Sequence, residues 1–240
     1  MTLSMKALLY ARYGQYPKEI EELIRAAGLE ILPPAPSSPS FPSPDVVVTF
    51  GGDGTILGAE RDYPGIPKLP LRDSKNCHIC STLPNEEIVR LLVKNKLPIR
   101  EYAKLEVICS QKHGLALNDV TIRNKLLNVA LRFTVTVNDE EPTPELIGDG
   151  VVIATPFGST AYSYSITHAI FNQGFGMAFN NIHNAALPER VVPEDAVIKV
   201  AITRGPADLG LDNDPEIPAL SDGDVIAVKK AAQTAKILTP

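Results

Sequence analysis

The feature that most constrains the fold is an apolar segment that runs directly into a glycine-rich turn. Residues 45–50 (DVVVTF) are mostly β-branched or aromatic and lack polar alternation, which is typical of a strand covered on both faces. Residues 51–55 (GGDGT) follow at once, and 55–61 is expected to be the helix that the turn opens. Glycines let a phosphate approach the backbone, and free N–H groups at the helix start point towards it. This segment predicts a phosphate site in a parallel α/β sheet.

Asp53 is the unusual member of the turn, because a carboxylate repels a phosphate. Its presence is explained if it holds Mg²⁺ or accepts the proton of an attacking hydroxyl. The alternative is that Asp53 only caps the helix. The turn is not a Walker A loop, since the sequence lacks the Gly-Lys-Ser/Thr element.

The remaining pattern divides the 240 residues into an α/β part and a mainly β part. A strand at 6–11 and helices at 17–27 and 84–93 surround the turn, whereas 33–44, rich in proline and serine, is expected to be a loop. We predict an α/β nucleotide-binding domain at 1–99, completed by 226–240, followed by a mainly β, dinucleotide-binding domain at 100–225. The strand-like segments of the second domain are 105–109, 115–122, 128–137, 150–154, 197–203 and 224–228.

Composition excludes several classes of protein. A net charge of −5 offers no basic surface for nucleic acid. No segment approaches the ~20 apolar residues of a membrane-spanning helix, and the first residues do not form a signal peptide. Three cysteines argue against a disulfide framework. The composition therefore favours a cytoplasmic enzyme with small-molecule partners, and neither a nucleic-acid nor a membrane partner.

Two further segments point to a ligand larger than a phosphate. Asn118 and Asp119 stand in 117–122 (LNDVTI); an asparagine donates and accepts, and an aspartate accepts from sugar hydroxyls or an amide. An ordinary turn is the structural alternative for this pair. Residues 149–163 (DGVVIATPFGSTAYS) run from a strand into a hydroxyl-rich turn, where we expect Ser159 or Thr160 to cap a helix.

In this order, the segments 51–55, 117–122 and 149–163 resemble the NAD kinase family, which is related to the diacylglycerol and sphingosine kinases and to the phosphofructokinases. The resemblance implies an α/β domain followed by a mainly β domain. It also implies transfer of a phosphoryl group from ATP, with Mg²⁺, to the 2′-hydroxyl of the adenosine ribose of NAD. Homodimers or homotetramers are usual in the family.

The resemblance also implies roles for individual residues. Asp53 matches the catalytic base, and no side chain is assigned to the metal, because Mg²⁺ is expected to come with the phosphates. The residues expected around the phosphates of ATP are Gly51, Gly52, Gly54 and Thr55. Those expected to bind NAD are Asn118, Asp119, Asp149, Ser159, Thr160, Ala161 and Tyr162, the last by stacking.

The sequence departs from this family at residues 65–80. Relatives have a glycine-rich loop there, whereas this chain has no glycine after Gly65. Arg72 and Lys75 could bind phosphate in place of backbone amides, or be ordinary solvated charges. Cys77 and Cys80 have the spacing of a metal knuckle, but a structural zinc site needs four ligands, so two ordinary loop cysteines are favoured.

These departures leave two other functions open. The same fold could phosphorylate another acceptor, such as a nucleotide, a lipid or a sugar. The chain could also be a non-catalytic sensor that binds NAD or ATP without turnover, and the missing glycine loop is the best argument for that alternative.

Overall fold

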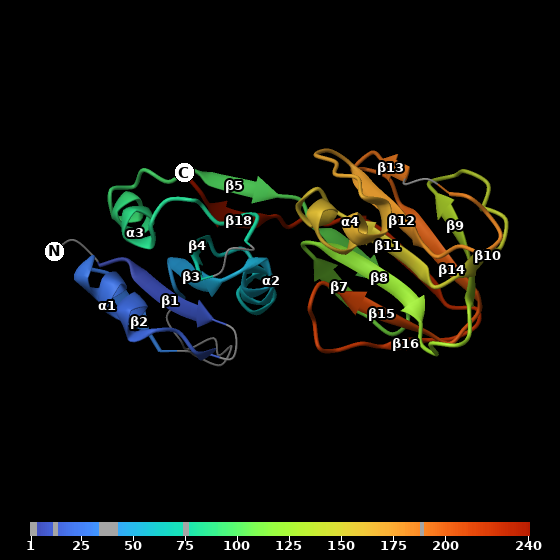
Figure 1. Cartoon of the computed structure of the whole chain (residues 1–240), viewed down its shortest axis with the longest axis horizontal. Coiled ribbons are helices and arrows are strands. Elements are labelled where there is room, and N and C mark those ends of the chain that lie inside the picture. Colours follow the sequence, from blue (N-terminus) through green and yellow to red (C-terminus); the bar gives the residue numbers. More distant parts are fainter. Residues whose placement is uncertain (1–3, 12–13, 34–42, 74–76, 188–189) are drawn as a thin grey trace. The chain divides into compact units, whose positions relative to one another are not determined.

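The computed structural model describes residues 4–11, 14–33, 43–73, 77–187 and 190–240. The chain forms two compact units, one of Met1–Tyr102 with Thr234–Pro240 and one of Ala103–Gln233 (Figure 1). The chain returns to the first unit at Thr234, later than the predicted residue 226. The reason is that β17 (Val225–Lys230) is hydrogen-bonded inside the second unit.

A six-stranded sheet in the order β2-β1-β3-β4-β18-β5 forms the centre of the first unit. Its neighbouring strands are parallel, except that β5 is antiparallel to β18. The predicted strands at 6–11 and 45–50 are confirmed as β1 and β3. The six strands are β1 (Lys6–Ala11), β2 (Glu30–Leu32), β3 (Val46–Gly51), β4 (Lys68–Arg72), β5 (Ile99–Tyr102) and β18 (Ala235–Leu238).

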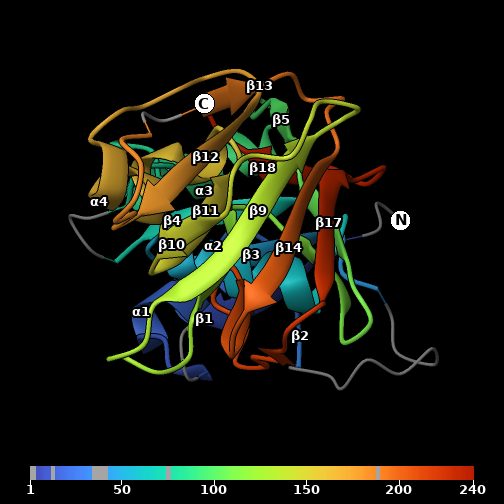
Figure 2. The same ribbon diagram turned by 90° about the vertical axis from the view of Figure 1, so that its right-hand side faces the viewer.

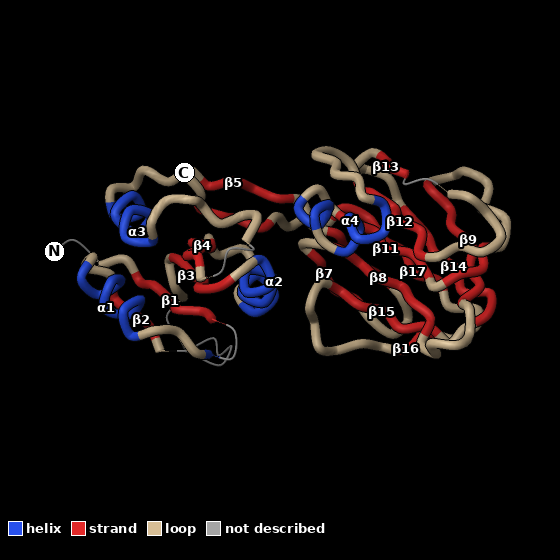
Figure 3. Tube along the Cα trace, in the orientation of Figure 1, coloured by secondary structure: helices blue, strands red, loops and turns tan. Residues whose placement is uncertain are grey.

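Helices cover both faces of this sheet, as the predicted α/β class requires (Figure 3). α1 (Lys18–Ala26) and α3 (Asn85–Val93) pack with Val46 and Val48 on one face, whereas α2 (Asp53–Asp62) packs with Val47 on the other. Val46, Val47 and Val48 of β3 therefore pack against a helix on whichever face they lie. This arrangement explains why 45–50 is apolar without alternation.

Two six-stranded sheets pack together to form the second unit (Figures 1 and 2). One has the order β10-β9-β14-β17-β6-β7 and the other β13-β12-β11-β8-β15-β16, all antiparallel. One hydrophobic core draws residues from both sheets. The strands are β6 (Leu105–Ile108), β7 (His113–Ala116), β8 (Asp119–Asn124), β9 (Leu131–Val137), β10 (Leu146–Gly148), β11 (Gly150–Ala154), β12 (Phe175–Asn180), β13 (Arg190–Val192), β14 (Ile198–Arg204), β15 (Ala207–Leu211), β16 (Ala219–Leu220) and β17.

The burial of single strands follows from these layers. Buried and half-buried residues alternate along β9, which has one face in the core, whereas every residue of β11 is buried. α4 (Tyr162–Thr167) packs against β11 and β12 and supplies the extra cover. The segment 115–122, predicted as one strand, is divided between β7 and β8, with Leu117 and Asn118 between them. None of the helices in the described ranges is long and apolar enough to cross a membrane.

Candidate functional site

The glycine turn joins β3 to α2 in the first unit, and its backbone geometry demands glycine. Gly51 has φ 153°, and a Cβ there would lie 2.2 Å from Thr55 Oγ1. Gly52 is the N-cap of α2, and no side chain caps this end of the helix. Asp53 is the first residue of the helix and its side chain makes no capping hydrogen bond, so the alternative that Asp53 only caps α2 is wrong.

The Asp53 carboxylate is instead bound by the loop that follows β4. The backbone N–H of His78 donates to Asp53 Oδ2 at 3.0 Å, and the N–H of Ile79 donates to Oδ1 at 3.2 Å. Cys77 Sγ lies 3.2 Å from Asp53 Oδ1, and Cys80 Sγ lies 3.7 Å from the carbonyl oxygen of Gly51. The loop 77–80 therefore lies directly on the turn.

Cys77 and Cys80 form a disulfide, which corrects the expectation of two ordinary loop cysteines. The odd cysteine count argued against a disulfide framework, but two cysteines separated by two residues pair locally, whatever the total number. Cys109 stays free and half-buried. Over the described residues, no group of three or more His, Cys, Asp or Glu side chains could hold a metal ion.

Arg72, at the end of β4, holds the same loop. Its Nη2 donates to the carbonyl oxygens of Cys77 at 3.2 Å and Cys80 at 2.9 Å, and its Nε donates to that of Ser81 at 3.2 Å. A phosphate contact by Arg72 stays a prediction, and it would compete with these three bonds. Lys75 lies outside the described residues.

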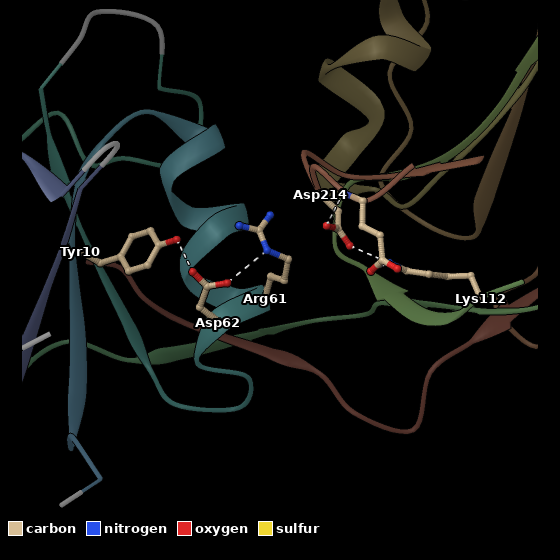
Figure 4. Close-up of polar contacts among 6 residues, drawn as sticks. Tyr10, Arg61, Asp62, Lys112 and Asp214 are labelled. Atoms are coloured by element: carbon tan, nitrogen blue, oxygen red, sulfur yellow. Dashed lines mark hydrogen bonds and ion pairs between the residues drawn. The ribbon is translucent and has the colours of Figure 1, made fainter. Parts of the chain in front are cut away.

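Three polar contacts hold α2, the helix that begins with Asp53, against the sheet. Lys68 of β4 and Glu60 of α2 form a buried ion pair, and Lys68 Nζ also donates to the carbonyl oxygen of Tyr63 at 2.6 Å. The hydroxyl of Tyr10 on β1 donates to Asp62 Oδ2 at 2.6 Å (Figure 4). Burial, with the hydrogen bond to Asp62, raises the pKa of Tyr10, so the phenol remains a donor. The last turn of α2 is thus tied to both β1 and β4.

Asn118 and Asp119 lie in the second unit, where Asp212 holds their backbone. Asp212 Oδ2 accepts the N–H of Leu117 at 2.7 Å, and its Oδ1 accepts those of Asn118 at 2.7 Å and Asp119 at 3.1 Å. Three bonds to one carboxylate explain why the strand is interrupted here. Close to this turn in sequence, Lys112 Nζ pairs with Asp214 Oδ2 at 3.0 Å (Figure 4).

Asp119, which is buried, and Asp212, which is half-buried, form an acidic pair. Burial raises the pKa of Asp119 to about 7; the charge of Asp212 adds to this, while a hydrogen bond from Thr121 acts the other way. Burial also raises the pKa of Asp212, although its three backbone donors oppose the shift. Asp119 therefore changes its charge near neutral pH, whereas an ordinary aspartate does so near pH 4.

The hydroxyl-rich turn after β11 packs against the backbone of Leu117 and Asn118. The Thr155 N–H donates to the Asn118 carbonyl oxygen at 2.9 Å, and Thr155 Oγ1 donates to that of Leu117 at 2.6 Å. A Cβ on Gly158 would lie 2.2 Å from the Asn118 carbonyl oxygen, so this approach requires glycine. The structure thus brings two of the predicted segments together.

The residues between this turn and α4 depart from one detail of the prediction. Ser159 lies in the 3₁₀ helix η2 (Phe157–Thr160), is buried, and donates its hydroxyl to the carbonyl oxygen of Pro156 at 2.8 Å. The N-cap of α4 is Ala161, without a side-chain cap bond, so the predicted cap by Ser159 or Thr160 is wrong. Thr160, Ala161 and Tyr162 are half-buried.

Asp149 and Tyr162 are connected through Asn180 at the end of β12. The Asp149 N–H donates to the Asn180 carbonyl oxygen at 2.9 Å, and Asn180 Nδ2 donates to the Tyr162 hydroxyl at 3.2 Å. Asp149 Oδ2 accepts from Asn181 Nδ2 at 2.7 Å, and the guanidinium carbon of Arg123 lies 5.9 Å from the centre of the Tyr162 ring. These contacts give a polar cluster with one half-buried aromatic face.

Some of these residues escaped the sequence-based assignment. Asp212 acts over more than 90 residues of sequence, so no local pattern reveals its contact with Asn118. Arg123 follows the predicted segment by one residue, and its charge next to 117–122 was the available signal. The spacing of Cys77 and Cys80 was the available signal for their disulfide, but the odd number of cysteines argued against it.

Comparison with known proteins identifies the family of this chain. The family model described as ATP-NAD kinase C-terminal domain matches residues 117–239. An NAD kinase of Sulfurisphaera tokodaii is 33% identical over 188 residues, which cover 76% of this chain and 71% of that protein. The chain belongs to the NAD kinase family.

Solved structures of the family share the fold. Yeast NADH kinase, complexed with NADH, superimposes with a TM-score of 0.84 at 17% identity, covering 99% of this chain and 84% of that one. An NAD kinase from Archaeoglobus fulgidus, in complex with ATP, gives a TM-score of 0.82 at 20% identity, covering 98% and 94%. The predicted fold class, an α/β domain followed by a mainly β domain, is confirmed for this member of the NAD kinase family.

Proposed function

We propose that this chain transfers the γ-phosphoryl group of ATP to the 2′-hydroxyl of the adenosine ribose of NAD, giving NADP and ADP. The observation that carries the proposal is the packing of the Asn118 backbone, next to Asp119, against the turn that Gly158 makes possible. It lies in the region matched by the ATP-NAD kinase domain. A half-buried amide and a buried carboxyl offer the donors and acceptors that an adenine and a ribose require.

In this proposal Asp53 takes the proton of the 2′-hydroxyl as oxygen attacks phosphorus, while the bond to the ADP oxygen breaks. Phosphoryl transfer depends mainly on positioning and charge neutralisation, to which a general base adds a further factor. Gly51, Gly52, Gly54 and Thr55 would surround the phosphates of ATP, since they lie at the start of α2, where the helix dipole favours an anion.

The NAD ligands are proposed from the second unit. Asp149 and Tyr162 would contact the dinucleotide beyond the adenosine, Tyr162 by stacking, with Thr160 and Ala161 beside it. Ser159 would contribute through its backbone, because its hydroxyl is already bonded to Pro156.

Mg²⁺ is proposed to arrive on the phosphates of ATP. The described residues contain no cluster of three or more metal-ligating side chains, and Mg²⁺ is commonly held by substrate phosphates with one or two carboxylates. When bound, the ion would neutralise charge on the transferred group. We also propose a cytoplasmic location and a homodimer or homotetramer. Light scattering on the purified protein would test the oligomeric state.

One experiment separates this function from its alternatives. The reduced full-length protein is incubated with ATP, Mg²⁺ and NAD, and NADP is detected with an NADP-specific dehydrogenase. NADP formation supports the proposal. NAD binding without NADP would favour a sensor, and ATP turnover that requires another nucleotide, a lipid or a sugar would favour a different acceptor.

A further inference from the structure

We propose that Cys77 and Cys80 form a redox-sensitive site: their disulfide clamps the Asp53 carboxylate, and reduction by a dithiol releases it and speeds phosphoryl transfer. The proposal rests on the function proposed above. It concerns the four-residue ring closed by the disulfide, Cys77-His78-Ile79-Cys80, called the cysteine ring below.

The cysteine ring donates hydrogen bonds to the Asp53 oxygens that the reaction needs as proton acceptors. A general base must lie within hydrogen-bond reach of the proton it removes. Both Asp53 oxygens accept a backbone N–H from the ring, those of His78 and Ile79, and Cys77 Sγ lies 3.2 Å from Oδ1. The oxidised ring therefore competes with a substrate hydroxyl for the same carboxylate.

The disulfide is what restrains the two donors. Arg72 binds the carbonyl oxygens of Cys77 and Cys80 and so fixes the ends of the ring. His78 is exposed and Ile79 half-buried, so packing holds them less than it holds the buried cysteines. When the covalent bond between Cys77 and Cys80 is cut, the ring becomes an open segment whose central N–H groups can leave Asp53.

A purely stabilising role explains this disulfide poorly. The entropy that a disulfide removes from the unfolded chain grows with the size of the loop it closes, and this loop has only four residues. In the proposed cytoplasmic location, moreover, disulfides are mostly transient, catalytic or redox-sensing. The position of the ring on a candidate catalytic carboxylate favours sensing.

The reduction is a thiol–disulfide exchange. A thiolate of the dithiol attacks one ring sulfur, and the other ring cysteine leaves as a thiolate. The second thiol of the dithiol then displaces the first ring cysteine and closes a disulfide of its own. Two electrons and two protons thereby pass to the Cys77–Cys80 pair. A cavity of about 410 Å³, lined by His78, Ile79, Arg100 and Tyr102 among others, lies beside the ring. In the proposal a small dithiol approaches from this side, where His78 and Ile79 must move to uncover the buried sulfurs.

The first test is kinetic. The oxidised full-length protein is assayed for NADP formation before and after anaerobic equilibration with dithiothreitol. We expect kcat to rise about tenfold or more, with a smaller change in KM, because the released base regains part of the rate enhancement that general bases usually give. The double variant C77S/C80S should be as active as the reduced protein and indifferent to dithiothreitol, whereas C109S should respond like the wild type. An unchanged or lower kcat after reduction would overturn the proposal.

The second test does not depend on activity. Amide hydrogen exchange is measured at His78 and Ile79 in the oxidised protein, the reduced protein and oxidised D53A. Loss of the Asp53 acceptor should speed exchange about tenfold in both altered forms. Protection that is equal in all three, or free thiols at Cys77 and Cys80 after air oxidation, would refute the clamp. If exchange behaves as expected but no NADP forms in either redox state, the clamp stands and the proposed function fails.

Discussion

Asp53 is the single residue on which the proposed chemistry depends most. Replacing it with asparagine keeps the Oδ1 acceptor for the Ile79 N–H but removes the group that takes the proton. The N–H of His78, which donates to Oδ2 of Asp53, would face an amide NH2 in its place. We therefore expect D53N to fold with a slightly lower melting temperature, and to lower kcat about 10²–10⁴-fold in the reduced protein. Stopped assays of NADP formation would measure this. The matched control is D139N, which changes an exposed carboxylate in the second unit. Full turnover by D53N would remove Asp53 from the mechanism.

Asp119 gives a prediction about stability and pH. Its pKa is about 7 in the folded protein and near 3.8 when unfolded, so the folded state binds the proton more tightly. The resulting stabilisation is complete below pH 4 and is lost as pH rises towards 7. D119N, which cannot ionise, should therefore match the wild type most closely near pH 4. At pH 8 it should be more stable by roughly 2–4 kcal/mol.

Urea unfolding of both proteins between pH 4 and pH 8 would test this. A stability difference that is independent of pH would show that Asp119 does not titrate in the range proposed. D139N again serves as the control, because it replaces an exposed aspartate of the same unit.

Among the elements, the turn after β11 depends on its glycine. A Cβ at Gly158 would meet the backbone carbonyl of Asn118, which cannot move without disturbing β8. We expect G158A to lose about 1–3 kcal/mol of stability, as overpacked sites do, and to raise KM for NAD more than KM for ATP. G210A is the matched control in the same unit, because its nearest neighbour would lie at an ordinary 3.8 Å. Equal behaviour of the two variants would contradict the packing described here.

The position of α2 gives another prediction, about the buried pair of Lys68 and Glu60. Removing one partner leaves a buried charge without its counterion, so K68M alone or E60Q alone should cost about 3–5 kcal/mol in urea unfolding. In the double variant neither charge remains, and most of that loss should be recovered. Additive losses would mean that the two residues do not act as a pair.

Elements formed by local patterns were predictable, and those formed by distant partners were not. The apolar run of β3 and the spacing of Ile20 and Ile24 in α1 are visible in the sequence itself. β4 was not predicted because it contains Pro70, and a proline argues against an inner strand of a sheet. β18 has four residues, and its place beside β4 and β5 is fixed only by the folded sheet.

For the candidate site, the same division holds. The glycine turn, the Asn118–Asp119 pair and the Thr155–Tyr162 segment carry their chemistry in consecutive residues. By contrast, Asp212 and the cysteine ring act on residues more than 20 positions away. Sequence alone therefore located the candidate ligands but not the groups that hold them.

At the scale of the whole molecule, the chain crosses from the first unit to the second and returns only for its last seven residues. β18, in this returning segment, joins β4 to β5, and Ala235, Ile237 and Leu238 are buried. Deleting 234–240 should therefore leave β4 as an open edge and β5 without β18, the strand it pairs with.

We expect this truncation to unfold or loosen the first unit while the second unit keeps its own core. Amide exchange in β1 and β3 should accelerate at least about tenfold, whereas amides of β9 and β14 should keep their protection, because the two units have separate cores. Removing Pro240 alone, an exposed residue outside β18, is the matched control and should change neither. Uniform acceleration in both units would mean that they fold as one cooperative body. Unchanged protection in β1 and β3 would mean that β18 contributes little to the sheet it completes.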